Sequence, residues 1–387
     1  MGIKMKIRAY IFLIALSFWA SNSFAQKGIK ELFEQKFQIS VVMPFCGKDL
    51  MENPNHKNAS IGNACRQYYE GFLLAMDSFK RAETPIEIRV FDTKRDSTTF
   101  QRILEKKEIQ NSDLIVGPVL KEGNELMLGF CNKNKIYHIS PFLTLTKSKI
   151  DNPYLISVYP DLNYYGDFIL NHIQDMGEEN ANIVVLTGKD NNDKVLSARI
   201  LALKSKYPLC TIKSIDISKY TDFKSAYKLG KPNRVIISSE NEFLVGSALR
   251  YLNDSNSFID IEVFGLRKWL EFKSLNIPQF ERLNVKIISP FYFDYTDSST
   301  KLFIERYREL YNTEPTEYAV TGYEQATYFM SSLILNHGNL GDIKSQKPNK
   351  PLSNWYKIES KPEGLSLQNN RLNILYFENG KLKRFEN

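Results

Sequence analysis

Residues 114–144, LIVGPVLKEGNELMLGFCNKNKIYHISPFLT, contain the pattern that decides the fold. Leu114–Val116 is a short apolar run that ends at Gly117-Pro118, which indicates a buried strand followed by a turn. Apolar residues then recur at the spacing of one helix face around residues 126–130. Residues 137–139 form a second apolar run, and a Ser-Pro pair follows it. This order predicts a βαβ unit with parallel strands.

The same alternation continues on both sides of this unit. Further strands are expected at residues 37–43, 86–91, 155–158, 183–186, 235–238, 261–264 and 285–288, and helices at 161–176, 192–206, 240–252 and 300–310. Apolar strands that alternate with amphipathic helices are typical of parallel sheets covered on both faces. Because the rhythm restarts after Pro153, the sequence predicts an α/β protein with two doubly wound parallel-sheet lobes.

The joins between the lobes are expected where the rhythm breaks, at residues 146–153 and 289–291. The helix at 317–335 comes after the second join and is expected to return to the first lobe. Residues 36–145 and 292–345 are therefore assigned to the first lobe, and residues 153–288 and 352–387 to the second lobe. Asn379 and Gly380 predict a tight hairpin near the end of the chain.

The first 25 residues have the features of a signal peptide. A basic start precedes an apolar run at residues 9–20, which is too short to span a bilayer comfortably. Small residues at Ser23 and Ala25 predict cleavage before Gln26. We therefore expect a soluble, extracytoplasmic and most simply periplasmic protein.

The charge pattern argues against nucleic acid as a partner, and the cysteine content leaves open whether a disulfide forms. The 51 Lys and Arg residues are interleaved with 44 Asp and Glu residues, which is typical of a solvated surface rather than of a nucleic-acid-binding face. Cys46 and Cys65 flank one loop and are the most plausible disulfide pair in an exported chain. Cys131 and Cys210 are expected to be free, buried thiols.

The sequence contains no pattern that indicates catalysis, a metal or a cofactor. None of the four histidines has a second His, Cys or acid at a ligand spacing, and no G-x-S-x-G or HExxH motif is present. We therefore expect a protein that is not an enzyme.

The remaining candidates for a site are the ends of the strands. In doubly wound sheets, ligands bind outside the carboxyl ends of the strands, and two lobes can present two such rows across one cleft. The expected ligand-binding residues at these ends are Gly117, Pro118, Ser140, Phe142, Leu143, Thr144, Glu240 and Arg267.

Two segments carry a resemblance to a known family. The order of Leu114–Val116, Gly117-Pro118, a helix and the loop at residues 139–144 resembles the first lobe of type I periplasmic binding proteins. The segment from Phe303 to Ala326 resembles their helix pair, through Tyr307, Tyr311, Pro315, Ala319 and Tyr323. The resemblance covers residues 36–387. It implies hinged lobes that close on a small molecule, often an amino acid, and pass it to an ABC-type membrane transporter.

Carried over residue by residue, the resemblance is partial. Leu143 and Thr144 match the loop that supplies backbone groups and a Thr hydroxyl to the ligand carboxylate. Lys121 lies in the loop where a Ser is usual. Arg267 and Lys268 stand where an acid usually holds the ligand ammonium, and they would repel that group.

The second lobe offers other polar side chains. We expect Tyr159, Tyr164 and Glu240 to approach the cleft from this side.

Two functions of different classes follow from these observations. The first is a solute-binding protein that closes on a small polar ligand, with an inner-membrane permease as its partner. The second is a ligand-free interaction or regulatory module of the cell envelope, for example one that contacts the cell-wall synthesis machinery. A cleft blocked by Phe142 or Lys121 favours the second.

Overall fold

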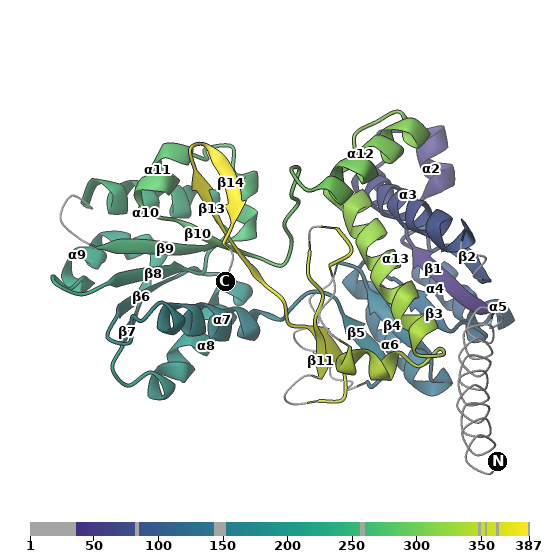
Figure 1. Ribbon diagram of the computed structural model, residues 1–387, viewed down its shortest axis with the longest axis horizontal. Coiled ribbons are helices and arrows are strands. Elements are labelled where there is room, and N and C mark those ends of the chain that lie inside the picture. Colours follow the sequence, from purple (N-terminus) through teal and green to yellow (C-terminus); the bar gives the residue numbers. More distant parts are fainter. Residues whose placement is uncertain are drawn as a thin grey trace, which may run out of the picture.

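The computed structural model has two lobes that lie side by side, each built on one sheet with helices around it (Figure 1). It describes residues 36–81, 85–142, 152–255, 260–346, 350–352, 354–360 and 364–385. The expected signal peptide and the expected site residues Leu143 and Thr144 lie outside these ranges, and the side chain of Lys121 is likewise not described. No helix within these ranges is long and apolar enough to cross a bilayer.

The first lobe has a seven-stranded sheet of order β11-β12-β5-β4-β3-β1-β2. Its strands are β1 (Phe37–Met43), β2 (Ile86–Asp92), β3 (Leu114–Val116), β4 (Tyr137–Ser140), β5 (Leu155–Ser157), β11 (Ile358–Ser360) and β12 (Leu367–Asn369). Its helices are α2 (Gly47–Glu52), α3 (Ala59–Arg81), α4 (Ser97–Leu104), α5 (Lys107–Gln110), α6 (Lys121–Asn134), α12 (Ser298–Tyr311), α13 (Glu317–Leu335) and the 3-10 helix η5 (Leu340–Ser345). β11 pairs antiparallel with β12 at one edge, and the other pairings are parallel.

The second lobe has a seven-stranded sheet of order β14-β13-β10-β9-β8-β6-β7. Its strands are β6 (Asn182–Thr187), β7 (Thr211–Asp216), β8 (Asn233–Ile237), β9 (Ile261–Leu266), β10 (Lys286–Ser289), β13 (Asn373–Glu378) and β14 (Lys381–Arg384). Its helices are α7 (Leu162–Asp175), α8 (Asn191–Ala202), α9 (Phe223–Ala226), α10 (Glu242–Ser255) and α11 (Ile277–Arg282), with 3-10 helices η1 (Leu203–Lys206), η2 (Ile217–Asp222) and η4 (Arg267–Glu271). The two mostly parallel sheets confirm the predicted fold class.

The return of α13 to the first lobe is confirmed, and glycines make it possible. A Cβ atom at Gly71 on α3 would lie 1.8 Å from the Ala319 carbonyl oxygen on α13. A Cβ atom at Gly322 on α13 would lie 1.9 Å from the Tyr68 carbonyl oxygen on α3. The two helix backbones therefore pack in direct contact, which only glycine at both crossing points permits.

The lobe boundaries differ from the predicted ones in two places. β5 pairs with β4 and β12, so the first lobe extends to Ser157 instead of ending near residue 145. β11 and β12 also belong to the first lobe, so only the chain from about residue 370 onward returns to the second lobe. The predicted hairpin of β13 and β14 is confirmed there, with Asn379 and Gly380 at φ of 52° and 74°.

Within the described residues, the chain passes between the lobes three times. We call residues 158–161 the first crossover, residues 290–297 the second and residues 370–372 the third. β5 and β10 each end where the chain leaves its lobe, and β3, β4, β8 and β9 run in the same direction as these strands. The carboxyl ends of the parallel strands in each sheet therefore face the other lobe, as predicted.

Candidate ligand-binding site between the lobes

The structure brings Gly117, Pro118 and Ser140 together at the end of the first-lobe sheet, but as a packed turn. Gly117 has a φ of 103°, and a Cβ atom there would lie 2.0 Å from the Val42 carbonyl oxygen, so this position requires glycine. The Gly117 N–H donates to the Ile139 carbonyl oxygen at 2.9 Å. The Ser140 hydroxyl donates to the Pro118 carbonyl oxygen at 3.4 Å. These groups are occupied by the protein itself.

Phe142 is held inside an aromatic group of the first lobe. Its ring makes edge-to-face contacts with Tyr68 and Tyr318, each at a centroid distance of 5.4 Å. Gln325 on α13 fixes the loop, because its Nε2 donates to the Pro141 carbonyl oxygen at 3.2 Å and its Oε1 accepts from the Tyr68 hydroxyl at 2.8 Å. Phe142 therefore fills space that a ligand beside this loop would need.

Two tyrosines lie at the interlobe face: Tyr159 in the first crossover, packed against the first-lobe core, and Tyr165 on α7 of the second lobe. Burial raises the pKa of Tyr159 to about 12, and the nearby Glu317 acts in the same direction. Burial also raises the pKa of Tyr165, whose charged neighbours are Glu240 and Arg267. Both hydroxyls therefore stay protonated at neutral pH and can act as hydrogen-bond donors.

Tyr164, the adjacent residue that was expected at the cleft, lies beside a different part of the first lobe. It packs against Phe168 at a centroid distance of 6.4 Å, and its charged neighbours are Glu359 and Arg371. Consecutive residues on a helix point about 100° apart, so the two adjacent tyrosines of α7 have different neighbours. Tyr165 lies near Tyr159 and Arg267, whereas Tyr164 lies near β11 and the third crossover.

Arg267 joins the two lobes through an ion pair with Glu317 at the start of α13. Its guanidinium carbon also lies 5.0 Å from the centre of the Phe291 ring, which belongs to the second crossover. Both members of the ion pair are partly exposed, with 29% and 42% of their side-chain surface accessible. The cation that would repel an ammonium ligand is thus neutralised by the protein's own carboxylate.

The segment that carries Arg267 is anchored by a buried tryptophan. Trp269 is fully buried, and its indole N–H donates to the Ser239 carbonyl oxygen at 2.9 Å. Its ring lies directly over Gly265, where a Cβ atom would approach a ring carbon to 2.2 Å. Gly265 therefore lets η4 dock closely, and this docking positions Arg267.

The hydroxyl groups at the ends of β6 and β8 also have partners within the lobe. Thr187 donates to the Ser197 hydroxyl at 2.9 Å, and Ser197 donates to the Ser238 hydroxyl at 3.0 Å. Glu240 is exposed beside them, and its pKa is raised by partial burial and by the nearby Asp193 carboxylate. Three of the residues expected at the cleft, Tyr159, Glu240 and Arg267, are neighbours of Tyr165.

The second crossover is fixed to α13 by a buried hydrogen-bonded chain. The Tyr292 N–H donates to Asn354 Oδ1 at 2.7 Å, and the Asn354 N–H and Nδ2 donate to the Glu324 carboxylate at 3.0 and 2.5 Å. Glu324 is fully buried. This chain ties a hinge segment to the first lobe and restrains the interlobe angle.

The cavity that touches Tyr159 is too small for a metabolite. It is lined by Tyr159, Phe291, Thr321 and Gln325 among others, and its volume is about 10 Å³. That volume is about one water molecule, whereas small-molecule sites span about 300–1,000 Å³. This cavity lies at the crossovers, and none of Phe142, Glu240 and Arg267 lines it.

Sequence analysis did not find Glu317, Tyr318, Tyr165 or Tyr68 as site residues. Glu317 and Tyr318 lie between Pro315 and Ala319 of the segment that resembles the family's helix pair, which placed them at a helix start. The sequence therefore indicated that Glu317 and Tyr318 begin a helix, but it did not indicate that the start of this helix reaches the other lobe.

Metal binding has no support in the described ranges. They contain no group of three His, Cys, Asp or Glu side chains arranged to hold a metal ion. The four cysteines are unpaired, and Cys210 is half-buried, whereas burial had been expected. Cys46 and Cys65 are both buried free thiols, so the disulfide expected between them is not formed in this structure.

Comparisons with known proteins agree on the fold. No family model matches the chain, and no curated protein matches it. A putative branched-chain amino acid ABC transporter protein from Rhodospirillum rubrum has a TM-score of 0.69 at 13% identity, with 91% of this chain and 100% of that chain covered. An ABC transporter substrate-binding protein from Desulfitobacterium hafniense, in complex with Leu, has a TM-score of 0.57 at 13% identity over 91% and 100%.

A third similar structure has a different role. The C-domain of LpoA from Haemophilus influenzae, described as a regulator of PBP1A, has a TM-score of 0.61 at 13% identity over 90% of this chain and 100% of that domain. The chain thus has the type I periplasmic-binding-protein fold, which is found both in transport receptors and in a regulator. These similar proteins are binding proteins or regulators rather than enzymes.

Proposed function

We propose that this chain is an exported, two-lobed interaction or regulatory module of the cell envelope, whose interlobe site is occupied by its own side chains. The observation that carries this proposal is that two expected ligand-binding side chains, Phe142 and Arg267, contact the protein's own Tyr318 and Glu317 at the start of α13. The cavity at Tyr159, between the crossovers, has a volume of only about 10 Å³, which is too small for a metabolite.

The groups that would bind a ligand are engaged within the protein, which supports the proposal. Phe142 packs between Tyr68 and Tyr318, and Arg267 pairs with Glu317. A ligand would have to displace these contacts before it gained any of its own. A filled cleft of this kind is expected when the fold acts through its outer surface.

A second candidate, a solute-binding protein for an ABC-type transporter, is favoured by one observation. The Arg267–Glu317 pair is partly exposed, and such pairs contribute only about 0–1 kcal/mol, so opening the lobes would cost little at this contact. Opening would uncover Tyr159, Tyr165 and Glu240, which suit a polar ligand without a free ammonium group. The inner-membrane permease would then be the partner.

Thermal unfolding of the mature chain distinguishes the two functions. The protein is mixed with the 20 amino acids, common carboxylates, sugars and nucleosides, each at 5 mM. A ligand present at 100 times its Kd adds about 2.7 kcal/mol of stability, which raises Tm by several degrees in a protein of this size. We expect no compound to raise Tm through the interlobe site.

A pair of matched variants shows whether a ligand-induced increase in Tm arises at the interlobe site. Glu317→Gln removes the interlobe ion pair, and Glu309→Gln, at an exposed position of α12, serves as the control. A Tm increase in the wild type that grows in Glu317→Gln but not in Glu309→Gln would contradict the proposal and establish the solute-binding function. In-cell cross-linking that recovers a permease would contradict it as well.

A further inference from the structure

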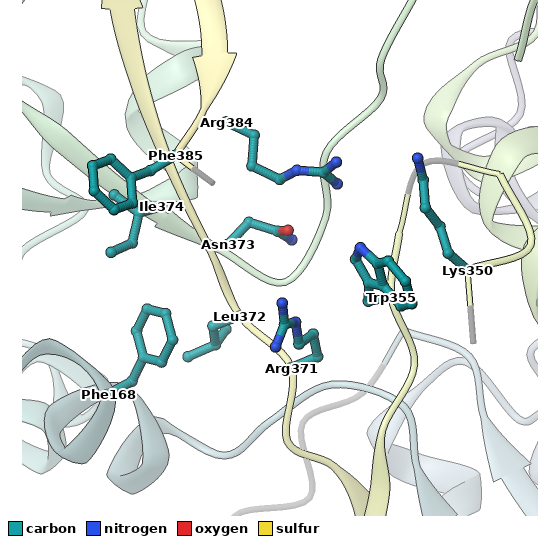
Figure 2. Close-up of a pocket in the computed structure, with 9 residues that line it drawn as sticks. All are labelled: Phe168, Lys350, Trp355, Arg371, Leu372, Asn373, Ile374, Arg384 and Phe385. Atoms are coloured by element: carbon teal, nitrogen blue, oxygen red, sulfur yellow. The ribbon is translucent and has the colours of Figure 1, made fainter. Parts of the chain in front are cut away.

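A second, larger cavity lies at the third crossover, away from the filled interlobe site. Its volume is about 410 Å³, within the usual range for small-molecule sites. Its walls come from both lobes, because Lys350 and Trp355 belong to the first lobe and Phe168 and Arg384 to the second. Figure 2 shows the chain of the third crossover, with Arg371, passing between them.

The cavity is lined by cations. Three of its nine lining side chains, Lys350, Arg371 and Arg384, are basic, and none is acidic. In Figure 2 the guanidinium groups of Arg371 and Arg384 reach toward the same space from two sides, with Asn373 between them and the Trp355 indole opposite. Guanidinium groups bind carboxylates and phosphates through paired hydrogen bonds, so this arrangement suits an anion.

Two carboxylates lie beside the cations of the cavity but not in its wall. Lys350 Nζ lies 3.8 Å from Asp297 Oδ1, and Asp294 lies near both Lys350 and Arg384. Neither acid lines the cavity. Arg371 is exposed and makes no ion pair within the described residues. The described lining of the cavity thus holds three cationic side chains and no carboxylate.

The other walls define the kind of anion. The Trp355 and Phe168 rings offer apolar faces, and Asn373 is held in place because its Nδ2 donates to the Ser289 carbonyl oxygen at 3.2 Å. A free inorganic ion would leave the apolar walls uncovered. We propose that this cavity binds a small organic anion with at least two acidic groups, a polycarboxylate or a phosphate ester.

Tryptophan fluorescence tests this proposal directly. The mature chain has two tryptophans, Trp269, which is fully buried, and Trp355, which lines the cavity. The protein is titrated with citrate and, separately, with fructose 1,6-bisphosphate at constant ionic strength. We expect at least one probe to change the Trp355 signal with a Kd below 1 mM, and the two probes distinguish carboxylate from phosphate ligands.

Variants assign the signal to the cavity. Arg371→Gln and Arg384→Gln are expected to weaken binding at least tenfold, and Trp355→Phe should abolish the fluorescence change. Arg250→Gln, an exposed arginine on α10, is the matched control and should bind as the wild type does. Raising NaCl from 20 to 500 mM should weaken binding severalfold, because salt screens exposed charges.

The outcomes are decisive. No saturable signal from either probe up to 5 mM, or equal affinities in Arg371→Gln, Arg384→Gln and Arg250→Gln, would overturn the proposal. Trp355 lines both this cavity and the small cavity at Tyr159, but Arg371 and Arg384 line only this one, so a negative result with their variants leaves the proposed function standing. Likewise, an amino acid bound at the interlobe site leaves this cavity to be judged by its own variants.

Discussion

His138 should make the stability of the first lobe depend on pH. It lies on β4 and is fully buried, and neither ring nitrogen makes a hydrogen bond of good geometry within the described residues. Burial lowers its pKa from 6.5 to about 4. The nearby Gly117 backbone opposes the effect of burial on its pKa only in part. The folded protein therefore keeps this imidazole neutral at a pH where the unfolded chain binds a proton.

The sign and size follow from linkage. Because the folded pKa is the lower one, the stability is fully present above pH 6.5 and is lost as pH falls toward 4. Between pH 8 and pH 5 the unfolded state gains about 2 kcal/mol from protonation at this residue, while the folded state gains almost nothing. At roughly 2–4 °C per kcal/mol, the wild type should lose about 4–8 °C of Tm through His138 alone.

The assay compares wild type with His138→Phe, which fills the same apolar site without a titrating group. Thermal unfolding is followed by circular dichroism at pH 8 and pH 5. The wild type should lose more Tm than the variant over this interval, while His337→Asn, at an exposed position, should behave as the wild type does. His172, whose pKa is also lowered by burial, contributes equally to all three proteins. Parallel losses in wild type and His138→Phe would refute the reasoning.

Two other predictions test the packing beside the site. Gly265→Ala should push Trp269 from its position and cost about 1–3 kcal/mol of stability. Gly129→Ala is the control, because this position on α6 has open space around it, and it should be neutral or stabilising by up to about 1 kcal/mol. Equal unfolding temperatures for the two variants would contradict the close docking of η4. Burial raises the pKa of Cys65 to about 12, and the neighbouring Cys46 acts in the same direction. Iodoacetamide at pH 8 should therefore label Cys65 far more slowly in native than in urea-unfolded reduced protein, as read by peptide mass spectrometry, and rapid native labelling would show that the thiol is accessible.

Much of the fold was predictable because short apolar runs identify buried strands wherever they occur. The run at 114–116 matches β3, and the Asn379 and Gly380 turn matches the terminal hairpin. The sequence pattern predicts that a strand exists but not to which of the two sheets it belongs. β5 is a short, mostly apolar run that fits either sheet, and β12 (Leu-Gln-Asn) has no apolar pattern that would predict a strand. Only their pairing with one another and with β4 decides the assignment.

The candidate site was predictable in its location but less so in its contacts. Gly117, Ser140, Glu240 and Arg267 could be predicted as site candidates because they follow predicted strands, and parallel topology alone brings the carboxyl ends of strands to one edge of the sheet. Glu317 is 50 residues from Arg267 in sequence, and no local pattern links the two. Likewise, the choice between Tyr164 and Tyr165 depends on the rotation of α7 about its axis, which is set by packing in three dimensions.

The central claim is that the protein's own side chains hold the lobes together across the cleft. Spin labels at Lys133→Cys on α6 and Lys224→Cys on α9, both exposed, report the interlobe distance in a Cys210→Ser background by double electron–electron resonance. The account predicts one narrow distance distribution that does not change when leucine, glutamate or the full amino-acid mixture is added at 10 mM. A second distance population in the free protein, or a shift on addition of an amino acid, would contradict it.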